Sequence, residues 1–481
     1  MISPPRVELW AILPVLVLFA GALGALLGAA FSRRSDQAPF ALLTLAVIAA
    51  AAATSLWLWD REPVTVLQAM VSVDRLAVVG TLMLCGIGAY GTYLGFHYFE
   101  RDGLRRNEFY ALLLFALGGM ALLVAAADLI VVFLAVEVLS LSLYVLTALT
   151  FRRGPIEAAM KYFLLGAFAS AFLLYGVALS YGAAGTTSVQ GLARALTGAA
   201  GSQALALAGA LLLVVGLGFK VSLVPFHMWT PDVYQGAPSP VTAFMAAATK
   251  VAVFIAMIRV FAVAFSALRW DLRPVIAVLA AVSMIVGSVL AISQTDVKRM
   301  LAYSSVAQAG FVLTAFVSPE RDGIAAALFY LVAYSLAVVG AFGVVMLISG
   351  GVGEQTHMDR FRGLGRRRPV LSVLLTVFLI SLAGIPPTAG FAAKVLVLGA
   401  ATTAGLWPLT LIGYLTSVAG AFFYLRIVAL MAMQEAEGDD VADGSPLPQI
   451  VLAVPAFAVV ALGIVPGVIV PLLQEAGVLT W

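Results

Sequence analysis

Apolar residues fill long runs along this chain, and short polar clusters separate them. About fourteen such runs begin near residues 8, 38, 75, 108, 128, 156, 203, 240, 273, 300, 323, 369, 406 and 450. Each run is close to the length of about 20 residues that a helix needs to cross a bilayer. Polar segments such as FSRRSDQ, ERDGLRRNE and HMDRFRGLGRRRP mark the boundaries. The pattern predicts an all-α polytopic membrane protein with about fourteen transmembrane helices.

Composition narrows the possible functions. The chain is 63% hydrophobic and 11% charged, which leaves no room for a sizeable soluble domain. The run near Trp10 lacks a strongly basic leader and a clear cleavage site, so we expect a retained helix. Cys85 is the single cysteine, and His97, His227 and His357 are scattered. We therefore expect no redox cofactor and no metal within this chain.

Basic residues predict the orientation in the membrane. If the N-terminus lies outside, most Arg and Lys residues fall in loops on the cytoplasmic side, as the positive-inside rule requires. Arg259 near a helix end and a minority of others fall on the opposite side. Both termini are then expected on the periplasmic side. The net charge of +3 follows from this bias and needs no nucleic-acid partner.

Lysine and arginine are placed differently. Arginines lie in loops or at helix ends and Lys298 lies in a loop, whereas four lysines fall inside predicted helices, namely Lys161, Lys220, Lys250 and Lys394. A buried lysine can take up and release a proton, while arginine stays charged. Intramembrane ionisable groups cost at least about 2.5–3.5 kcal/mol each and usually line an ion or proton path. Lys161 follows Glu157 by four residues, so a structural anchor is an equal alternative there.

Glu137 is the only carboxylate placed near mid-membrane. Ser140 and Tyr144 follow it by three and seven residues, so one helix face carries all three. A structural ion-pair role is the alternative for Glu137. For His227, a helix-end cap or a packed core histidine is the alternative.

Prolines interrupt two helices beside buried lysines. Pro225 is expected to free the carbonyl of Val221 next to Lys220, and the Pro386 and Pro387 pair to free those of Leu382 and Ala383 upstream of Lys394. Freed carbonyls in a membrane must face protein or water. The prolines could simply produce kinks that serve helix packing, but broken helices also mark ion sites in transporters.

Spacing suggests an internal repeat. Lys220 and Lys394 are 174 residues apart, and Gln308 follows Glu137 by 171. These offsets suggest two five-helix units over 108–265 and 273–430, and an odd helix number would invert the second unit. A three-helix segment over 1–107 would precede them. An acidic loop and a C-terminal helix would follow over 431–481.

Several runs together resemble a known family. They are EVLSLSLYVL, EAAMKYFLLGAFASAFLLYG, GFKVSLVPFHMWTPDVYQGAPSPVTAF, KRMLAYSSVAQAGF and LAGIPPTAGFAAK. They resemble the antiporter-like subunit N of bacterial respiratory complex I, the proton-pumping NADH:quinone oxidoreductase, over residues 75–430. The resemblance implies two inverted five-helix repeats with broken helices 7 and 12.

The same resemblance implies roles for particular residues. Glu137 matches the family's glutamate on helix 5, Lys220 its partner lysine on helix 7, Lys250 the central lysine on helix 8 and Lys394 the lysine on helix 12. Lys161 matches a further lysine on helix 6, and His227 a histidine after the first break. FMN, iron–sulfur clusters and quinone are expected in other subunits. The expected partners are the other antiporter-like membrane subunits and the lipid bilayer of the bacterial inner membrane.

Two positions qualify the resemblance. Relatives often have histidine where this chain has Gln308, and glutamine can relay a hydrogen bond but cannot hold a charge near neutral pH. Subunit M has a glutamate at the site of Lys394, so this lysine favours subunit N. Mrp-type cation/proton antiporter subunits match the GIPPTAGF run less well and are the alternative.

The resulting hypothesis is proton translocation along a mid-membrane row of Glu137, Lys220, Lys250 and Lys394, driven by quinone reduction in other subunits. A secondary transporter for sodium or an organic solute should show more clustered carboxylates. A purely structural membrane subunit should tolerate loss of the lysines.

Overall fold

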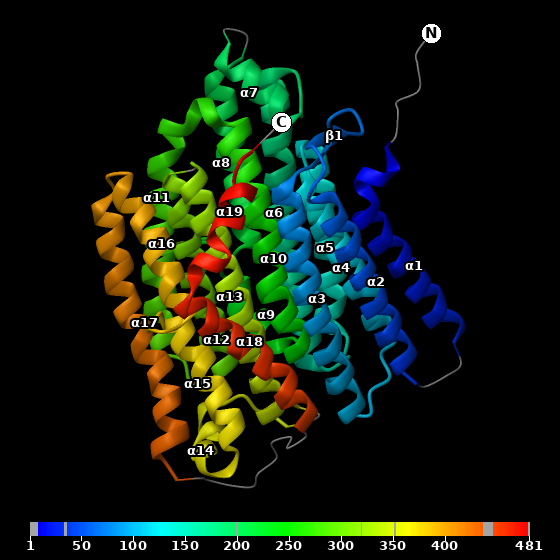
Figure 1. The fold of residues 1–481 in the computed structure, drawn as a ribbon, viewed down its shortest axis with the longest axis vertical. Coiled ribbons are helices and arrows are strands. Elements are labelled where there is room, and N and C mark those ends of the chain that lie inside the picture. The colour runs from blue at the N-terminus through cyan, green and yellow to red at the C-terminus, as the bar shows by residue number, and fades with distance from the viewer. Residues whose placement is uncertain are drawn as a thin grey trace.

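Long helices run side by side through the whole molecule (Figure 1). The computed structural model describes residues 8–32, 36–198, 201–318, 320–350, 353–435 and 446–479. Within these ranges, thirteen helices are long and apolar enough to cross a membrane. The shorter helices α15 (Pro369–Ala383) and α16 (Ala389–Thr403) follow one another as a further crossing. The predicted fold class is therefore confirmed. Most of the predicted acidic loop lies outside the described residues.

Three helices and a small β-hairpin precede the first of two similar helix groups. The helices are α1 (Leu13–Phe31), α2 (Ala38–Leu58) and α3 (Arg75–Arg101), and the antiparallel strands are β1 (Val64–Val66) and β2 (Val71–Val73). The next group consists of α4 (Glu108–Ala125), α5 (Leu129–Ala148), α6 (Arg153–Ala184), α7 (Val189–Thr197), α8 (Gln203–Lys220), α9 (Trp229–Gly236) and α10 (Ser239–Arg259). Helices α8 and α9 form one interrupted crossing.

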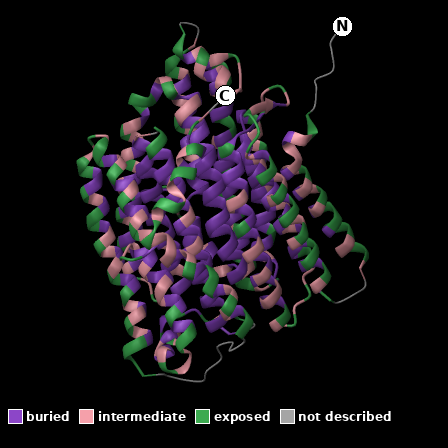
Figure 2. Cartoon of the chain, viewed as in Figure 1, coloured by how far each residue is buried: buried purple, intermediate pink, exposed green. Residues whose placement is uncertain are grey.

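A second group follows with a similar order of lengths. It consists of α11 (Arg269–Ile292), α12 (Val297–Thr314), α13 (Arg321–Ile348), the short α14 (Leu364–Arg367), the interrupted α15 and α16, and α17 (Trp407–Met433). The chain ends with α18 (Pro446–Ile464) and α19 (Val470–Ala476). Figure 2 shows buried residues filling the middle of the bundle, and all 21 residues of α10 are buried. Lys250 lies on this central helix.

One capping motif occurs twice. Asp128 caps α5 and accepts a hydrogen bond from Thr187 Oγ1 at 2.7 Å. Asp296 caps α12 in the same way and accepts from Thr356 Oγ1 at 2.5 Å. The two aspartates are 168 residues apart, and each forms an antiparallel bridge with the residue after its threonine. Because α5 is the fifth crossing and α12 the tenth, the motif lies at opposite ends of the bundle. This supports inverted repetition, while the exact unit bounds stay a prediction.

A buried ion pair ties α10 to α3. Arg259 at the end of α10 is completely buried and donates two hydrogen bonds to Asp74, at 2.7 Å and 2.6 Å. Its Nε donates to the carbonyl of Val124 at 2.7 Å. Asp74 also caps α3 by accepting from the Ala77 amide. The sequence placed Arg259 near a helix end, but its burial and its partner 185 residues away were not predicted.

We expect Arg259→Ala to destabilise the subunit strongly. The substitution leaves the Asp74 carboxylate buried without its counter-charge, which costs about 3–5 kcal/mol. The matched control is Arg75→Ala, because Arg75 pairs with Glu475 at 3.0 Å in an exposed position where a pair contributes at most about 1 kcal/mol. Thermal unfolding of the purified membrane assembly measures both. Equal midpoints for the two variants would show that the buried pair is dispensable.

Candidate functional site

Two lysines, Lys220 of α8 and Lys250 of α10, lie around the break in the first interrupted crossing. Helix α8 ends at Lys220, and Ser222 adopts a left-handed conformation with φ of 66° before α9 begins. The Val221 carbonyl, which Pro225 was expected to free, accepts a hydrogen bond from Lys250 Nζ at 2.7 Å. The indole of Trp229 donates to the Phe219 carbonyl at 2.9 Å. Side chains from inside the bundle therefore satisfy these two carbonyls of the break.

The second interrupted crossing repeats this chemistry. Helix α15 ends before Gly384, whose φ of 82° is left-handed, and a Cβ there would lie 2.7 Å from the side chain of Lys394. Lys394 Nζ donates to the freed Ala383 carbonyl and to Ser417 Oγ, both at 2.7 Å. Gln308 Nε2 donates to the Leu382 carbonyl at 2.8 Å. All three carbonyls expected to be freed thus accept from Lys250, Lys394 or Gln308.

Lys220 and Lys394 lie on different sides of their breaks in chain order. Lys220 ends the half before its break, whereas Lys394 lies in the half after its break. Their spacing of 174 residues is therefore not the repeat register. The helix caps give a register of 168, which pairs Glu137 with Ser305. Gln308 lies about one helical turn further on, so it is a polar neighbour of the residue that the repeat pairs with Glu137.

Lys220 forms its hydrogen bond with Tyr144 and not with Glu137. Lys220 Nζ donates to Tyr144 Oη at 3.2 Å, while the Glu137 carboxylate accepts from Ser170 Oγ on α6. In the described ranges, no ion pair within 4 Å joins Glu137 to Lys220. A Cβ on Gly166 of α6 would lie 1.9 Å from Tyr144 Oη, so glycine makes room for this hydroxyl. The predicted polar face of α5 is present, but its hydroxyl makes the contact with lysine.

Hydroxyl and amide groups continue the polar region into the second unit. Lys250 Nζ lies 5.9 Å from the ring centroid of Tyr334, whose hydroxyl contacts Ser305 Oγ at 2.9 Å. Gln308 accepts from Tyr330 and donates to Tyr424 Oη at 3.2 Å. These tyrosines were not predicted from the sequence. The available signal was a hydroxyl inside an otherwise apolar run, which Tyr330, Tyr334 and Tyr424 share.

The three lysines on the breaks and on α10 are deeply buried. Their exposed fractions are 2% for Lys220, 2% for Lys250 and 6% for Lys394. Lys161 differs, because 43% of its side chain is exposed and it pairs with Glu157 at 2.8 Å and Asp232 at 2.9 Å. This geometry favours the anchoring alternative for Lys161. His227 lies in the first break, and its Nδ1 is buried without a hydrogen-bond partner in the described part of the chain.

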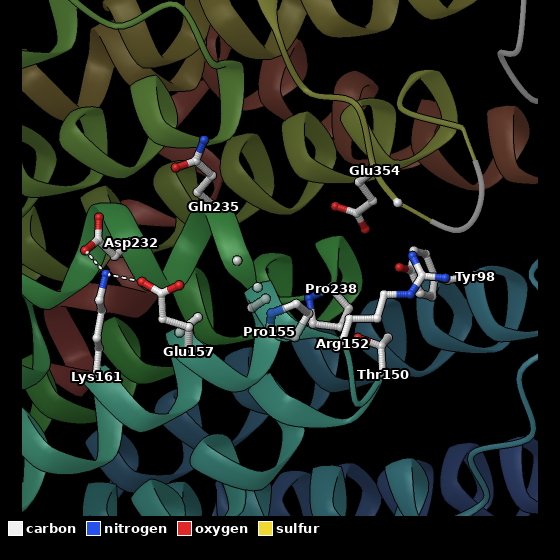
Figure 3. Close-up of a pocket in the computed structure, with 15 residues that line it drawn as sticks. Tyr98, Thr150, Arg152, Pro155, Glu157, Lys161, Asp232, Gln235, Pro238 and Glu354 are labelled. Atoms are coloured by element: carbon white, nitrogen blue, oxygen red, sulfur yellow. Dashed lines mark hydrogen bonds and ion pairs between the residues drawn. The ribbon is translucent and has the colours of Figure 1, made fainter.

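Lys161 stands at the edge of a polar hollow (Figure 3). The hollow has a volume of about 430 Å³ and lies between the starts of α6 and α10, the ends of α3 and α9, and the segment before α14. We name it the α6 vestibule. Lys161 lies between Glu157 and Asp232 on one side, and Glu354 faces the hollow on the other.

Glu354 forms part of the α6 vestibule wall and binds the start of α10. It accepts from the Ser239 amide at 2.8 Å and from Ser239 Oγ at 2.7 Å, and it pairs with Lys298 at 2.7 Å. Lys298 also donates to the Ala237 carbonyl at 2.5 Å. The expectation of a loop lysine is corrected here, because Lys298 lies in the first turn of α12 and is 1% exposed. The helix begins at Val297, three residues before the end of the polar run SQTDVKR would suggest.

Known proteins share this architecture. The family described as NADH:quinone oxidoreductase/Mrp antiporter, TM, matches residues 126–420. The chain is 45% identical to NADH-quinone oxidoreductase subunit N of Acidothermus cellulolyticus, covering 99% of this chain and 97% of that protein. A chain in the structure of respiratory complex I from Thermus thermophilus with bound aureothin superposes with a TM-score of 0.83 and 36% identity, covering 96% of this chain and 99% of that one.

A third comparison concerns the fold alone. A chain of the Mrp complex from Dietzia sp. DQ12-45-1b superposes with a TM-score of 0.85, covering 98% of this chain and 97% of that one. The two sequences are only 23% identical. The backbone arrangement is therefore shared more widely than the sequence.

The Glu354 carboxylate gives a pH-dependent test of the α6 vestibule. Burial alone raises its pKa, but the Lys298 ammonium and the hydrogen bonds from Ser239 outweigh burial and hold the pKa below its ordinary value of 4.5. A depressed pKa in the folded state adds stability that is fully present above about pH 4.5 and is lost as the pH falls further. We expect Glu354→Gln to lower stability near pH 7 by about 3–5 kcal/mol and to weaken this acid dependence.

Thermal unfolding of the intact assembly at a series of pH values measures the effect. The matched control is Glu157→Gln in the same vestibule, because Glu157 is 68% exposed in its pair with Lys161. It should change stability by no more than about 1 kcal/mol. Matching acid profiles for Glu354→Gln and the parent protein would contradict the assignment.

Proposed function

The chain belongs to the NADH:quinone oxidoreductase/Mrp antiporter membrane family, among the relatives named NADH-quinone oxidoreductase subunit N, and from this membership we propose that it carries protons across the membrane through its buried polar row. The row comprises Glu137, Tyr144, Lys220, Lys250, Ser305, Gln308, Tyr334, Lys394 and Tyr424. Subunit N is favoured over an Mrp-type subunit because full-length identity is 45% to the former, while the Mrp chain matches in fold alone.

The observation that carries the proposal is the pairing of lysine amines with freed backbone carbonyls. Lys250 and Lys394 each donate to a carbonyl at a helix break. A neutral amine still has N–H donors, so the carbonyl keeps a partner after the lysine releases a proton. A carboxylate partner would instead be left as an unpaired buried charge. Deprotonation is therefore compatible with an intact break.

Neutral groups connect the lysines. Tyr144 contacts Lys220, and the Ser305 and Tyr334 hydroxyls stand between Lys250 and the Gln308 region. A hydroxyl both donates and accepts, so it can pass a hydrogen bond along a chain of water molecules. Gln308 can orient such a chain through Tyr330 and Tyr424 without becoming charged. This role replaces the protonatable histidine that relatives often carry.

Glu137 sits at the beginning of this row. Its carboxylate lies on the same helix face as Tyr144, two helical turns from it. Its negative charge stabilises the charged form of Lys220, and withdrawal of that influence favours proton release. Transfer of one proton against 100 mV requires about 2.3 kcal/mol, which is comparable to the free energy of rearranging a buried charge pair.

The surrounding assembly supplies the driving force in this proposal. The chain would sit in the bacterial inner membrane beside other antiporter-like subunits, with both termini on the periplasmic side. The described Arg360, Arg362, Arg366, Arg367 and Arg368 lie at the bundle end opposite the C-terminal helix α19, as the positive-inside rule requires for that orientation. FMN, iron–sulfur clusters and quinone would belong to other subunits.

We expect Glu137→Gln and Lys220→Ala to reduce proton pumping in the assembled complex. Removing a positioned proton-transfer group costs roughly 10²–10⁴-fold in a rate that depends on it, so at least about a tenfold loss is expected. Proton uptake by inside-out membrane vesicles during NADH oxidation measures this rate. Thr54→Ala is the control, because Thr54 bonds only within its own helix α2, far along the chain from the row. Near-normal pumping by both row variants in a fully assembled complex would exclude the proposed roles.

Lys394→Arg separates proton transfer from simple electrostatics. Arginine keeps the positive charge and donates to carbonyls, but it does not release its proton near neutral pH. We expect a loss comparable to that of Lys220→Ala, again at least about tenfold. Arg426→Lys makes the reverse exchange at the far end of α17, where Arg426 donates to the Ile292 carbonyl at 3.2 Å, and should pump normally. Full pumping with arginine at position 394 would assign Lys394 a purely electrostatic role.

A further inference from the structure

Two arginines lie close together at the end of the bundle where the positive-inside rule expects few. Arg269 and Arg273 stand in the first two turns of α11. This helix is the ninth crossing, so it begins at the same end of the bundle as α13 and α19. In the proposed orientation this end is periplasmic. Like charges four residues apart on a helix repel each other, so their placement points to a negatively charged partner.

Neither arginine has a carboxylate partner in the part of the chain that the structure describes. Arg75, at the same end, pairs with Glu475. Arg259 pairs with Asp74. Asp271 lies between the two α11 arginines in the sequence, but residues two apart on a helix do not face each other. An anion for this pair therefore has to come from outside the described residues.

Arg273 borders a small hollow and keeps one donor without a partner. One of its terminal nitrogens donates to the Ala404 carbonyl at the end of α16. Its Nε is buried and has no hydrogen-bond partner among the described residues. The hollow between the two arginines has a volume of about 20 Å³, with Phe261, Phe316 and Val317 among its walls. That volume suffices for one oxygen of the size of a water molecule, and apolar walls strengthen the attraction between an anion and a guanidinium.

An exposed tryptophan places this pair at the level of lipid headgroups. The two guanidinium carbons lie 5.4 Å and 5.6 Å from the ring centroid of Trp270. Trp270 is exposed, and so is Trp407 at the start of the neighbouring helix α17. Tryptophan is enriched where headgroups meet hydrocarbon, and arginine donors match phosphate oxygens in a bidentate geometry. Depth and chemistry together favour a lipid phosphate.

The outer face of α11 brings hydrocarbon close to the pair. Helices α11 and α17 are neighbours at one edge of the bundle (Figure 1), and Val278 and Ile285 of α11 are exposed. At about 100° per residue, Trp270 lies on the helix between the arginine side and this exposed apolar side. A lipid whose acyl chains cover the apolar side can therefore bring its headgroup past Trp270 to the arginines.

We propose that Arg269 and Arg273 bind the phosphodiester of an anionic phospholipid in the leaflet at this end of the bundle. One phosphate oxygen lies in the hollow and accepts a hydrogen bond from Arg273 Nε, and a second accepts from Arg269. No covalent bond is made or broken. The bound lipid ties the start of α11 to the end of α16, which Arg273 already contacts. This inference does not depend on proton transport.

Photo-crosslinking tests the site in the assembled complex. The complex is reconstituted into phosphatidylcholine vesicles that contain a trace of phosphatidylglycerol with a diazirine next to its ester group. After illumination, peptide mapping by mass spectrometry should place the label on the start of α11. Because each arginine supplies charge-assisted hydrogen bonds, the double variant Arg269→Gln, Arg273→Gln should lower this labelling about tenfold or more.

Arg194→Gln is the matched control for the crosslinking experiment. Arg194 lies at the same end of the bundle in α7, where its side chain donates to Gln190, and its loss should leave the label on α11 unchanged. Arg269→Gln alone covers the case in which the double variant does not assemble, because Arg269 is exposed and makes no hydrogen bond or ion pair within the described chain. It should lower the labelling several-fold. Arg269→Lys should retain more of the label, since the charge remains.

Competition separates the possible anions. Excess unlabelled phosphatidylglycerol should remove the label, and excess inorganic phosphate should not. Equal labelling of Arg269→Gln and the parent complex would overturn the inference. Loss of the label on addition of inorganic phosphate would assign the pair to a soluble anion instead. An unlabelled α11 in the parent complex would mean that a neighbouring protein covers the pair, which would also overturn the lipid assignment.

Discussion

The structure depends on how two interrupted helices satisfy their backbone inside a membrane. A helix break frees carbonyls that hydrocarbon cannot hydrogen-bond, at a cost of several kcal/mol per group. Here Lys250, Lys394 and Gln308 donate to the carbonyls of Val221, Ala383 and Leu382. Each buried amine thus has a structural partner, and each break has a buried donor. The same contact explains how buried lysine and glutamine side chains are accommodated inside an apolar helix bundle.

Inversion of the two helix groups places the two interrupted crossings, the seventh and the twelfth, in opposite directions. The capping motifs of Asp128 and Asp296 lie at opposite ends of the bundle. The completely buried helix α10 carries Lys250, which bonds to the first break. Its two ends are fixed by buried ion pairs, Arg259 with Asp74 and Lys298 with Glu354. The helix that carries Lys250 is therefore anchored at both ends.

The sequence predicted the fold class, the two breaks and the buried lysines, because each has a strong one-dimensional signal. The length of each hydrophobic run predicts a membrane crossing, and a proline near a lysine in such a run predicts a helix break. Contacts between side chains that are far apart in the sequence leave no such one-dimensional signal. The contacts of Arg259 with Asp74 and of Lys298 with Glu354 span 185 and 56 residues. The Tyr144 contact with Lys220 was missed because the charges suggested a direct ion pair, whereas a hydroxyl occupies the space that Gly166 provides.

The neutral character of the connecting groups also limits how the row can work. Tyr144, Ser305 and Gln308 can reorient hydrogen bonds, but none of them stores a proton near neutral pH. In the proposed row, charge can therefore rest only on the lysines and on Glu137, with uncharged groups between them. In the proposed row, directional transport therefore requires the lysines to release their protons in a defined order.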